Sequence, residues 1–391
     1  MKKSVLVALL LSLATLDVGA QNNDQQDTSF KPSGELSGYV FGDYAFKFQA
    51  DEQKRGAQQY SGLKKDYSSF NIRRLYLQYR YRFTPVISSH ITLAHESGTE
   101  ANSNRTDLLP DGNRSIFVKH AYIQFDQVIS RAAIVLGQQA TPTFSRLSET
   151  IWHYRSIEKT VTDMRGISAS SDLGLGVYGK IGKKERWGYD VLYANNSGTK
   201  FITDTHKKLY TSLYTYFFDK KLVVQVNYEY NRTLPFSNIS GNTQLVKAFM
   251  GYETAQTSVG VEVFKQFNKN STLYRHAAGA VNSFSTRNTA AGISAFYTGT
   301  IQSEKLKFFA RIDWFNPDTN FKPDRFYSEG YPSTKELFAT IGVDYEPVKN
   351  IHLMPNLWLN HYESKNINGL NTPKNGSDIV GRVTFYYLFN K

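Results

Sequence analysis

The connections along this chain alternate strictly between short and long, and no other feature of the sequence limits the fold as much. They separate sixteen segments in which apolar and polar residues alternate, as in a strand whose two faces meet different surroundings. The segments span residues 35–48, 69–83, 87–97, 116–127, 131–139, 172–182, 187–197, 207–218, 221–232, 243–254, 257–267, 287–301, 305–315, 335–346, 350–362 and 377–390. Seven connections have two to four residues, and the other eight have nine to 32. This rhythm predicts an all-β fold, a transmembrane antiparallel β-barrel of about sixteen strands with periplasmic termini.

The stretch 70–83, FNIRRLYLQYRYRF, shows the two faces of such a strand. One alternate set holds Leu75, Leu77, Tyr79, Tyr81 and Phe83, and the other holds Arg74, Tyr76, Gln78, Arg80 and Arg82. We expect the first set to face lipid and the second to face a water-filled lumen. A secreted β-sandwich would also alternate, but its loops would not need to sort by length at every second turn.

The first twenty residues have the composition of a secretory signal peptide. Two lysines precede an apolar run at 5–16, and Val18-Gly19-Ala20 offers a small-residue cleavage site. We therefore divide the chain into a signal peptide (1–20), a short N-terminal segment (21–34) and an outer-membrane barrel (35–391). After residue 20 no apolar stretch approaches the ~20 residues that a spanning helix needs. The formal charge of +12 does not indicate nucleic acid, because an exported chain rarely meets it; we expect another anionic partner or an anionic surface.

Charged residues fall repeatedly on the predicted lumen face. The cations we select as candidates for an anion pathway on the strands are Arg74, Arg80, Lys247, Lys307, Arg311 and Arg382. Carboxylates lie there too, at Asp126, Glu229, Glu253, Glu262, Asp313 and Asp344. Arginine suits weakly hydrated oxyanions because its planar fork donates two parallel hydrogen bonds. The alternative is that these charges pair with one another and only keep the lumen wet.

The connection 140–171 is the longest, and loops of this length are usually functional or disordered. Its aromatic residues Phe144, Trp152 and Tyr154 favour packing over disorder. Arg146, Arg155 and Lys159 add three cations to the candidate pathway. We expect a long third loop that folds toward the lumen and narrows it; an external cap is the open alternative.

Several stretches, in this order, resemble the porin O and porin P family of phosphate-selective outer-membrane porins. They are FNIRRLYLQYRYRF, VKHAYIQFDQ, LGQQATPTFSRLSE, DMRGISAS and LGVYGKIGKKERWGYDVLYANNSG, all within residues 69–200. The resemblance implies a sixteen-stranded barrel, a homotrimer and passive passage of phosphate-like anions. It also places Arg74 on the family's arginine-bearing strand, and Arg146 and Arg155 in its constriction loop.

We therefore expect a porin in the outer membrane for passive diffusion of small anions, with phosphate and other oxyanions as candidate solutes. A general diffusion porin without anion selectivity is the first alternative, and a surface adhesin or structural barrel is the second. We expect no enzyme, cofactor or metal, because the histidines lie on scattered strands and no Gly-x-Ser-x-Gly or His-Glu-x-x-His spacing occurs.

Overall fold

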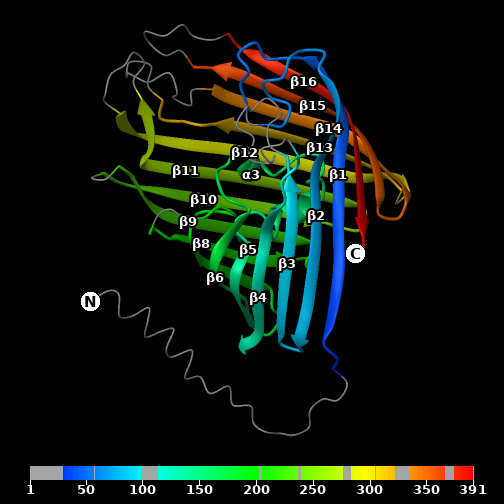
Figure 1. Cartoon of the computed structure of the whole chain (residues 1–391), viewed down its shortest axis with the longest axis vertical. Coiled ribbons are helices and arrows are strands. Elements are labelled where there is room, and N and C mark those ends of the chain that lie inside the picture. Colours follow the sequence, from blue (N-terminus) through cyan, green and yellow to red (C-terminus); the bar gives the residue numbers. More distant parts are fainter. Residues whose placement is uncertain are drawn as a thin grey trace.

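The computed structural model describes residues 30–56, 58–97, 113–201, 205–236, 239–275, 283–303, 305–321, 334–365 and 374–390. Sixteen antiparallel strands close into one barrel, in which each strand pairs with its neighbours in sequence and β1 pairs with β16 (Figure 1). The strands are β1 (Ser33–Gln49), β2 (Ser68–Thr84), β3 (Ile87–Glu96), β4 (Phe117–Ile129), β5 (Ala132–Ala140), β6 (Ser171–Ile181), β7 (Trp187–Ala194), β8 (Lys208–Phe217), β9 (Leu222–Phe236), β10 (Ile239–Glu253), β11 (Thr257–Arg275), β12 (Ser283–Ser303), β13 (Leu306–Asn316), β14 (Thr334–Val348), β15 (Ile351–Ser364) and β16 (Gly376–Phe389). The predicted fold class and all sixteen predicted strands are thus confirmed.

Strands β9 to β12 extend beyond their predicted ends. β11 continues to Arg275, eight residues past the predicted end at 267, and β12 begins at Ser283 instead of 287. Their outer parts are polar, so hydrophobic alternation carries no signal there, whereas antiparallel hydrogen bonding continues between the two strands. Part of what we assigned to long loops is therefore strand.

The two faces of the barrel wall have the predicted character. On β2, Leu77, Tyr79 and Phe83 are exposed on the outside, while Tyr76, which belongs to the other alternate set, is only 5% exposed. The outside of the other strands also carries exposed apolar side chains, among them Val226, Ile293, Ile341 and Leu357. Among the described residues, no helix is both long and apolar enough to cross a membrane.

Two of the β-bulges in the described strands each add a cation to the lumen. On β2, Phe41 pairs with Arg74 and Gly42 pairs with Ile72, so Arg73 is an extra residue. On β4, Thr92 pairs with His120 and Leu93 with Val118, so Lys119 is extra. A bulge turns two successive side chains toward one face. Arg73, which strict alternation places against lipid, is therefore buried inside with Arg74.

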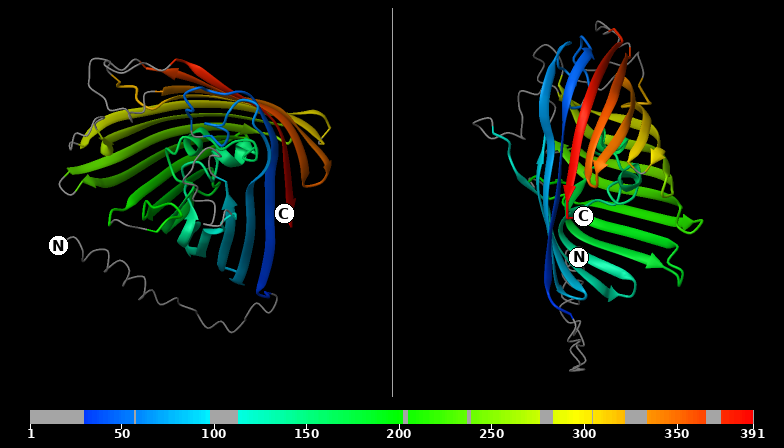
Figure 2. Two further views of the ribbon diagram at one scale, coloured as in Figure 1. Left: turned by 45° about the horizontal axis from the view of Figure 1, so that its top comes forward. Right: turned by 90° about the vertical axis from the view of Figure 1, so that its right-hand side faces the viewer.

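The core lies inside the barrel, where two inserted loops pack against the wall. The connection between β5 and β6, residues 141–170 and hereafter loop 3, runs through the interior and carries α2 (Ser148–Trp152) and α3 (Val161–Met164) (Figure 2). The connection between β1 and β2, hereafter loop 1, also turns inward, so that Tyr60 packs in one cluster with Met164 and Trp358. The inward position of loop 3 agrees with our expectation, but that of loop 1 was not predicted.

Candidate functional site

Loop 3 packs its apolar side chains against one half of the wall, formed by β9–β16 and β1 and hereafter called the packed half. The fully buried ring of Trp152 contacts Phe296 and Phe309, with ring centroids 5.1 and 6.4 Å apart. Val161, at the start of α3, joins a cluster with residues of β10, β11, β12 and β13. The aromatic residues that favoured packing over disorder therefore fix where the loop sits.

Cations of the wall donate hydrogen bonds to backbone carbonyl groups of loop 3. The Lys247 ammonium lies 2.7 Å from the Thr143 oxygen, and Arg382 lies 3.1 Å from the Ile157 oxygen. Arg311 binds the Lys159 carbonyl, and Arg73 binds that of Ser156. All four side chains are buried. Three of our pathway candidates, Lys247, Arg311 and Arg382, thus direct their charges to the loop backbone.

Carboxylates of the same half accept hydrogen bonds from the loop. Glu262 accepts from Thr162 at 2.8 Å, Asp344 accepts from Tyr154 at 3.2 Å, and Glu229 accepts from Ser168. The lumen charges that contact loop 3 are therefore paired, as in our alternative reading, but their partners include the loop. Such buried charges are costly unless they are paired and hydrogen-bonded, which makes the position of loop 3 well determined.

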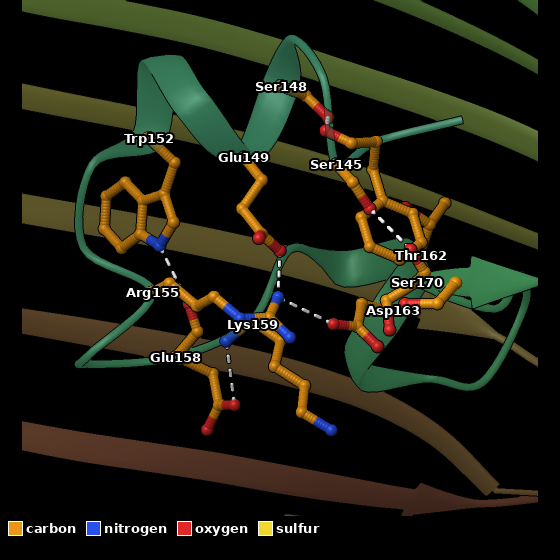
Figure 3. A network of polar contacts seen from close by, with 12 residues as sticks. Ser145, Ser148, Glu149, Trp152, Arg155, Glu158, Lys159, Thr162, Asp163 and Ser170 are labelled. Carbon is orange, nitrogen blue, oxygen red and sulfur yellow. Dashed lines mark hydrogen bonds and ion pairs between the residues drawn. The ribbon is translucent and has the colours of Figure 1, made fainter. Parts of the chain in front are cut away.

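A single arginine links the two helical parts of loop 3. Arg155 pairs with Glu149 of α2 and, at 2.9 Å, with Asp163 of α3 (Figure 3). The Trp152 indole donates to the Glu158 carbonyl at 2.8 Å and holds the intervening turn (Figure 3). Arg155 is thus neutralised by two carboxylates of its own loop, although it faces away from the packed half.

The other half of the wall, β2–β8 and hereafter the open half, faces this charged side of loop 3. Here Glu96 pairs with Arg74 at 2.8 Å and with Lys119 at 2.9 Å. Lys119 also donates to Ser170 at the end of the loop, at 2.6 Å. We call the charged groups between loop 3 and the open half the constriction. Its members are Arg74, Glu96, Lys119, Glu149, Arg155, Lys159 and Asp163.

The constriction holds four cations and three carboxylates. Arg74, Lys119 and Arg155 each pair with a carboxylate, and Lys159 differs from them. Its backbone accepts from Arg311, but its ammonium makes no hydrogen bond or ion pair with the described residues. In Figure 3 the Lys159 side chain extends away from the network around Arg155. Lys159 is therefore the cation of the constriction whose ammonium has no hydrogen bond or ion pair with the described residues, although the charge of Asp163 acts on it.

Neighbouring charges set the ionisation of the loop 3 groups. Asp163 acts most strongly on Lys159 and raises its pKa, but burial and the positive charge of Arg74 outweigh it, so the pKa of Lys159 is lowered. Burial raises the pKa of Glu149 despite the nearby Arg155. The pKa of Asp163 is lowered because Lys159 and Arg155 overcome the effect of burial.

The remaining candidates lie along the lumen away from the constriction. Arg80 is exposed and lines a cavity with His90, Tyr122 and Asp126. Lys307 lines a pocket together with Asp344 and with Tyr154 of loop 3. Arg146, at the start of the loop, lies 3.6 Å from Asp190 and remains 40% exposed. The structure therefore does not gather the nine candidates at one place.

Sequence reasoning missed Arg73 and Lys119. Both occupy bulges, and a bulge leaves no trace in the alternation of side chains. The only available signal was the pair Arg73-Arg74, because two adjacent arginines cannot both face water on a regular strand beside lipid.

Comparison with known proteins supports the fold alone. No protein-family model matches the sequence, and no curated protein matches it. Among solved structures, the outer membrane channel DcaP of Acinetobacter baumannii is 15% identical, with a TM-score of 0.63, over 92% of this chain and 97% of that one. An anion-selective porin from Comamonas acidovorans and OmpT of Vibrio cholerae in its trimer form are each 10% identical, with TM-scores of 0.57, over 92% of this chain and 100% of theirs.

Proposed function

We propose that this chain is an outer-membrane porin through which small anions diffuse passively. Phosphate and other oxyanions are the solutes we propose, in keeping with the resemblance to the porin O and porin P family. The observation that carries the proposal is Lys159, a cation on the inward-folded loop 3 whose ammonium has no ion-pair partner among the described residues. The exposed apolar outer wall supports a membrane location. We also propose that the protein forms a homotrimer and that residues 1–20 are a signal peptide that is cleaved off. Residues 1–20 lie outside the described residues.

The route for solutes follows from how loop 3 is attached. Its aromatic side chains and backbone carbonyls fill the space toward the packed half. The charges of Glu149, Arg155, Lys159 and Asp163 instead interact with Arg74, Glu96 and Lys119 of β2–β4. We therefore place the route between loop 3 and the open half. Only a narrow passage discriminates ions strongly, because salt screens charges beyond ~8 Å at physiological ionic strength.

Planar-bilayer recordings test this function directly. We expect stepwise conductance from the purified protein and a reversal potential that indicates anion preference in a KCl gradient. Lys159→Gln should reduce that preference strongly, and Arg146→Ala should reduce it less. Lys54→Gln and Lys64→Gln, at exposed positions of loop 1, serve as charge-matched controls. Equal effects of all four substitutions, or equal cation and anion permeability in the unmodified protein, would refute anion selection.

A general diffusion porin is the second candidate, and a specific observation favours it. Arg74, Arg155, Lys247 and Arg311 are all neutralised by carboxylates within 4 Å. A lumen with so much internal compensation keeps little net field. Equal permeability to cations and anions, in a protein whose loop 3 is still packed against the wall, would establish that it is a general diffusion porin.

A further inference from the structure

Asp190 of β7 is a buried carboxylate that the constriction does not use. By strand register it lies between Tyr178 of β6 and Ser212 of β8, and it is 1% exposed. Neither carboxylate oxygen accepts a hydrogen bond from the described residues. Buried carboxylates are normally hydrogen-bonded, so the absence of such bonds here needs a reason.

Two cations lie close to Asp190 without hydrogen-bonding to it. The Arg146 Nε atom is 3.6 Å from Asp190 Oδ2, and the Lys180 ammonium donates instead to the Tyr214 hydroxyl at 3.1 Å. The negative charge of Asp190 is therefore not taken up by a short ion pair. It acts on Arg146 through space, in surroundings that screen it poorly.

Arg146 is held in place by an aromatic ring. Its guanidinium carbon lies 4.1 Å from the centroid of Tyr178, whose hydroxyl donates to Gln139. Gly176 makes room for this ring, since a Cβ atom there would lie 2.7 Å from the Tyr178 hydroxyl oxygen. With one face on the ring and no hydrogen bond to the described residues, the 40% exposed guanidinium keeps free donors for an oxyanion.

We propose that Asp190 is a positioning residue that limits how long an oxyanion stays on Arg146. This inference rests on the proposed anion passage and identifies a second anion-binding position, separate from Lys159. Conduction requires binding that is strong enough to attract an ion and weak enough to release it. The Tyr178 ring orients the guanidinium, and the Asp190 carboxylate lowers its attraction for an anion.

The test is the block of chloride current by inorganic phosphate in planar bilayers. Asp190→Asn keeps the shape of the side chain and removes its charge, so the half-blocking phosphate concentration should fall about threefold, with longer blocking events. Asp172→Asn is the matched control, because Asp172 is also buried in the lumen wall but is hydrogen-bonded to Tyr210 at 2.9 Å.

A double-mutant cycle separates this effect from a change in the fold. If Asp190 acts through Arg146, Asp190→Asn should have no effect on phosphate block in an Arg146→Ala background. An unchanged block in Asp190→Asn, or the same change with and without Arg146, overturns the role of Asp190 while anion passage stands. If phosphate does not block the unmodified channel at all, the proposed oxyanion passage is refuted together with it.

Discussion

The packed and open halves of this barrel wall contain the same kinds of charged residues, yet use them differently. In the packed half, Lys247, Arg311 and Arg382 are buried against carbonyl groups of loop 3, and they hold a chain segment in place. In the open half, Arg74 and Lys119 are paired with Glu96, but Arg80 is exposed and lines a cavity. What differs is the cover over each half: loop 3 packs directly on the packed half, whereas part of the open half borders a cavity.

This difference shows that a luminal arginine is not in itself an ion-binding residue. A barrel of this size needs a loop inside it to become selective, and such a loop must be fixed by groups strong enough to overcome its conformational entropy. Part of the luminal charge is therefore structural. The predictions below test this division, beginning with the packed half.

The largest effect should come from removing the main aromatic contact of loop 3. Trp152→Ala deletes a fully buried ring and should weaken the seating of the loop by about 3–5 kcal/mol. We expect single-channel conductance to rise and current noise to increase as the loop leaves the wall. Phe201→Ala, at a 90% exposed aromatic residue, is the control and should change neither. Unchanged conductance in Trp152→Ala would mean that the loop does not depend on this contact.

A comparable loss of stability should follow from breaking one buried ion pair of the packed half. Arg311→Met leaves the buried Asp313 without its partner, which typically costs about 3–5 kcal/mol. Thermal unfolding should therefore begin at a lower temperature, and Arg311→Met combined with Asp313→Leu should recover part of the loss. Arg80→Met, at an exposed cation, should change stability by less than about 0.5 kcal/mol. Equal destabilisation by the two single substitutions would remove the distinction between the halves.

The pH dependence of selectivity should identify Lys159 as the cation that acts in the constriction. Because its pKa is lowered, Lys159 should lose its positive charge at a lower pH than an ordinary lysine. Anion preference should then fall as the pH rises through the alkaline range. Lys159→Arg should keep the preference over that range, since arginine stays protonated. Reversal potentials that fall equally in both proteins would assign the titration to another group.

The smallest effects should come from single cations far from the constriction. Arg80→Ala and Lys307→Ala should each lower chloride conductance slightly at low salt, because they attract anions into the wide parts of the lumen. At 1 M salt the Debye length falls to about 3 Å, and both effects should disappear. If the loss persists at high salt, these side chains bind ions directly and belong with Lys159.

Alternation and loop length were enough to predict the barrel, its strand number and its two faces. Both follow from local rules: side chains alternate along any strand, and a membrane barrel places short turns at one end. The aromatic residues of loop 3 correctly indicated packing. The sequence did not show which cations the loop would cover, because the hydrogen bonds from Lys247 to Thr143 and from Arg382 to Ile157 join residues more than one hundred positions apart.

The sequence alone therefore determined the architecture and the supply of luminal charge, while the tertiary structure decided which charges remain available. Two bulges turned Arg73 and Lys119 inward, and no periodicity reports a bulge. The inward fold of loop 3 then buried some cations and left Arg146 40% exposed and the Lys159 ammonium without an ion pair among the described residues. Whether a luminal cation stays unpaired depends on the groups that lie opposite it in space. Closure of the barrel brings these groups together from distant parts of the chain.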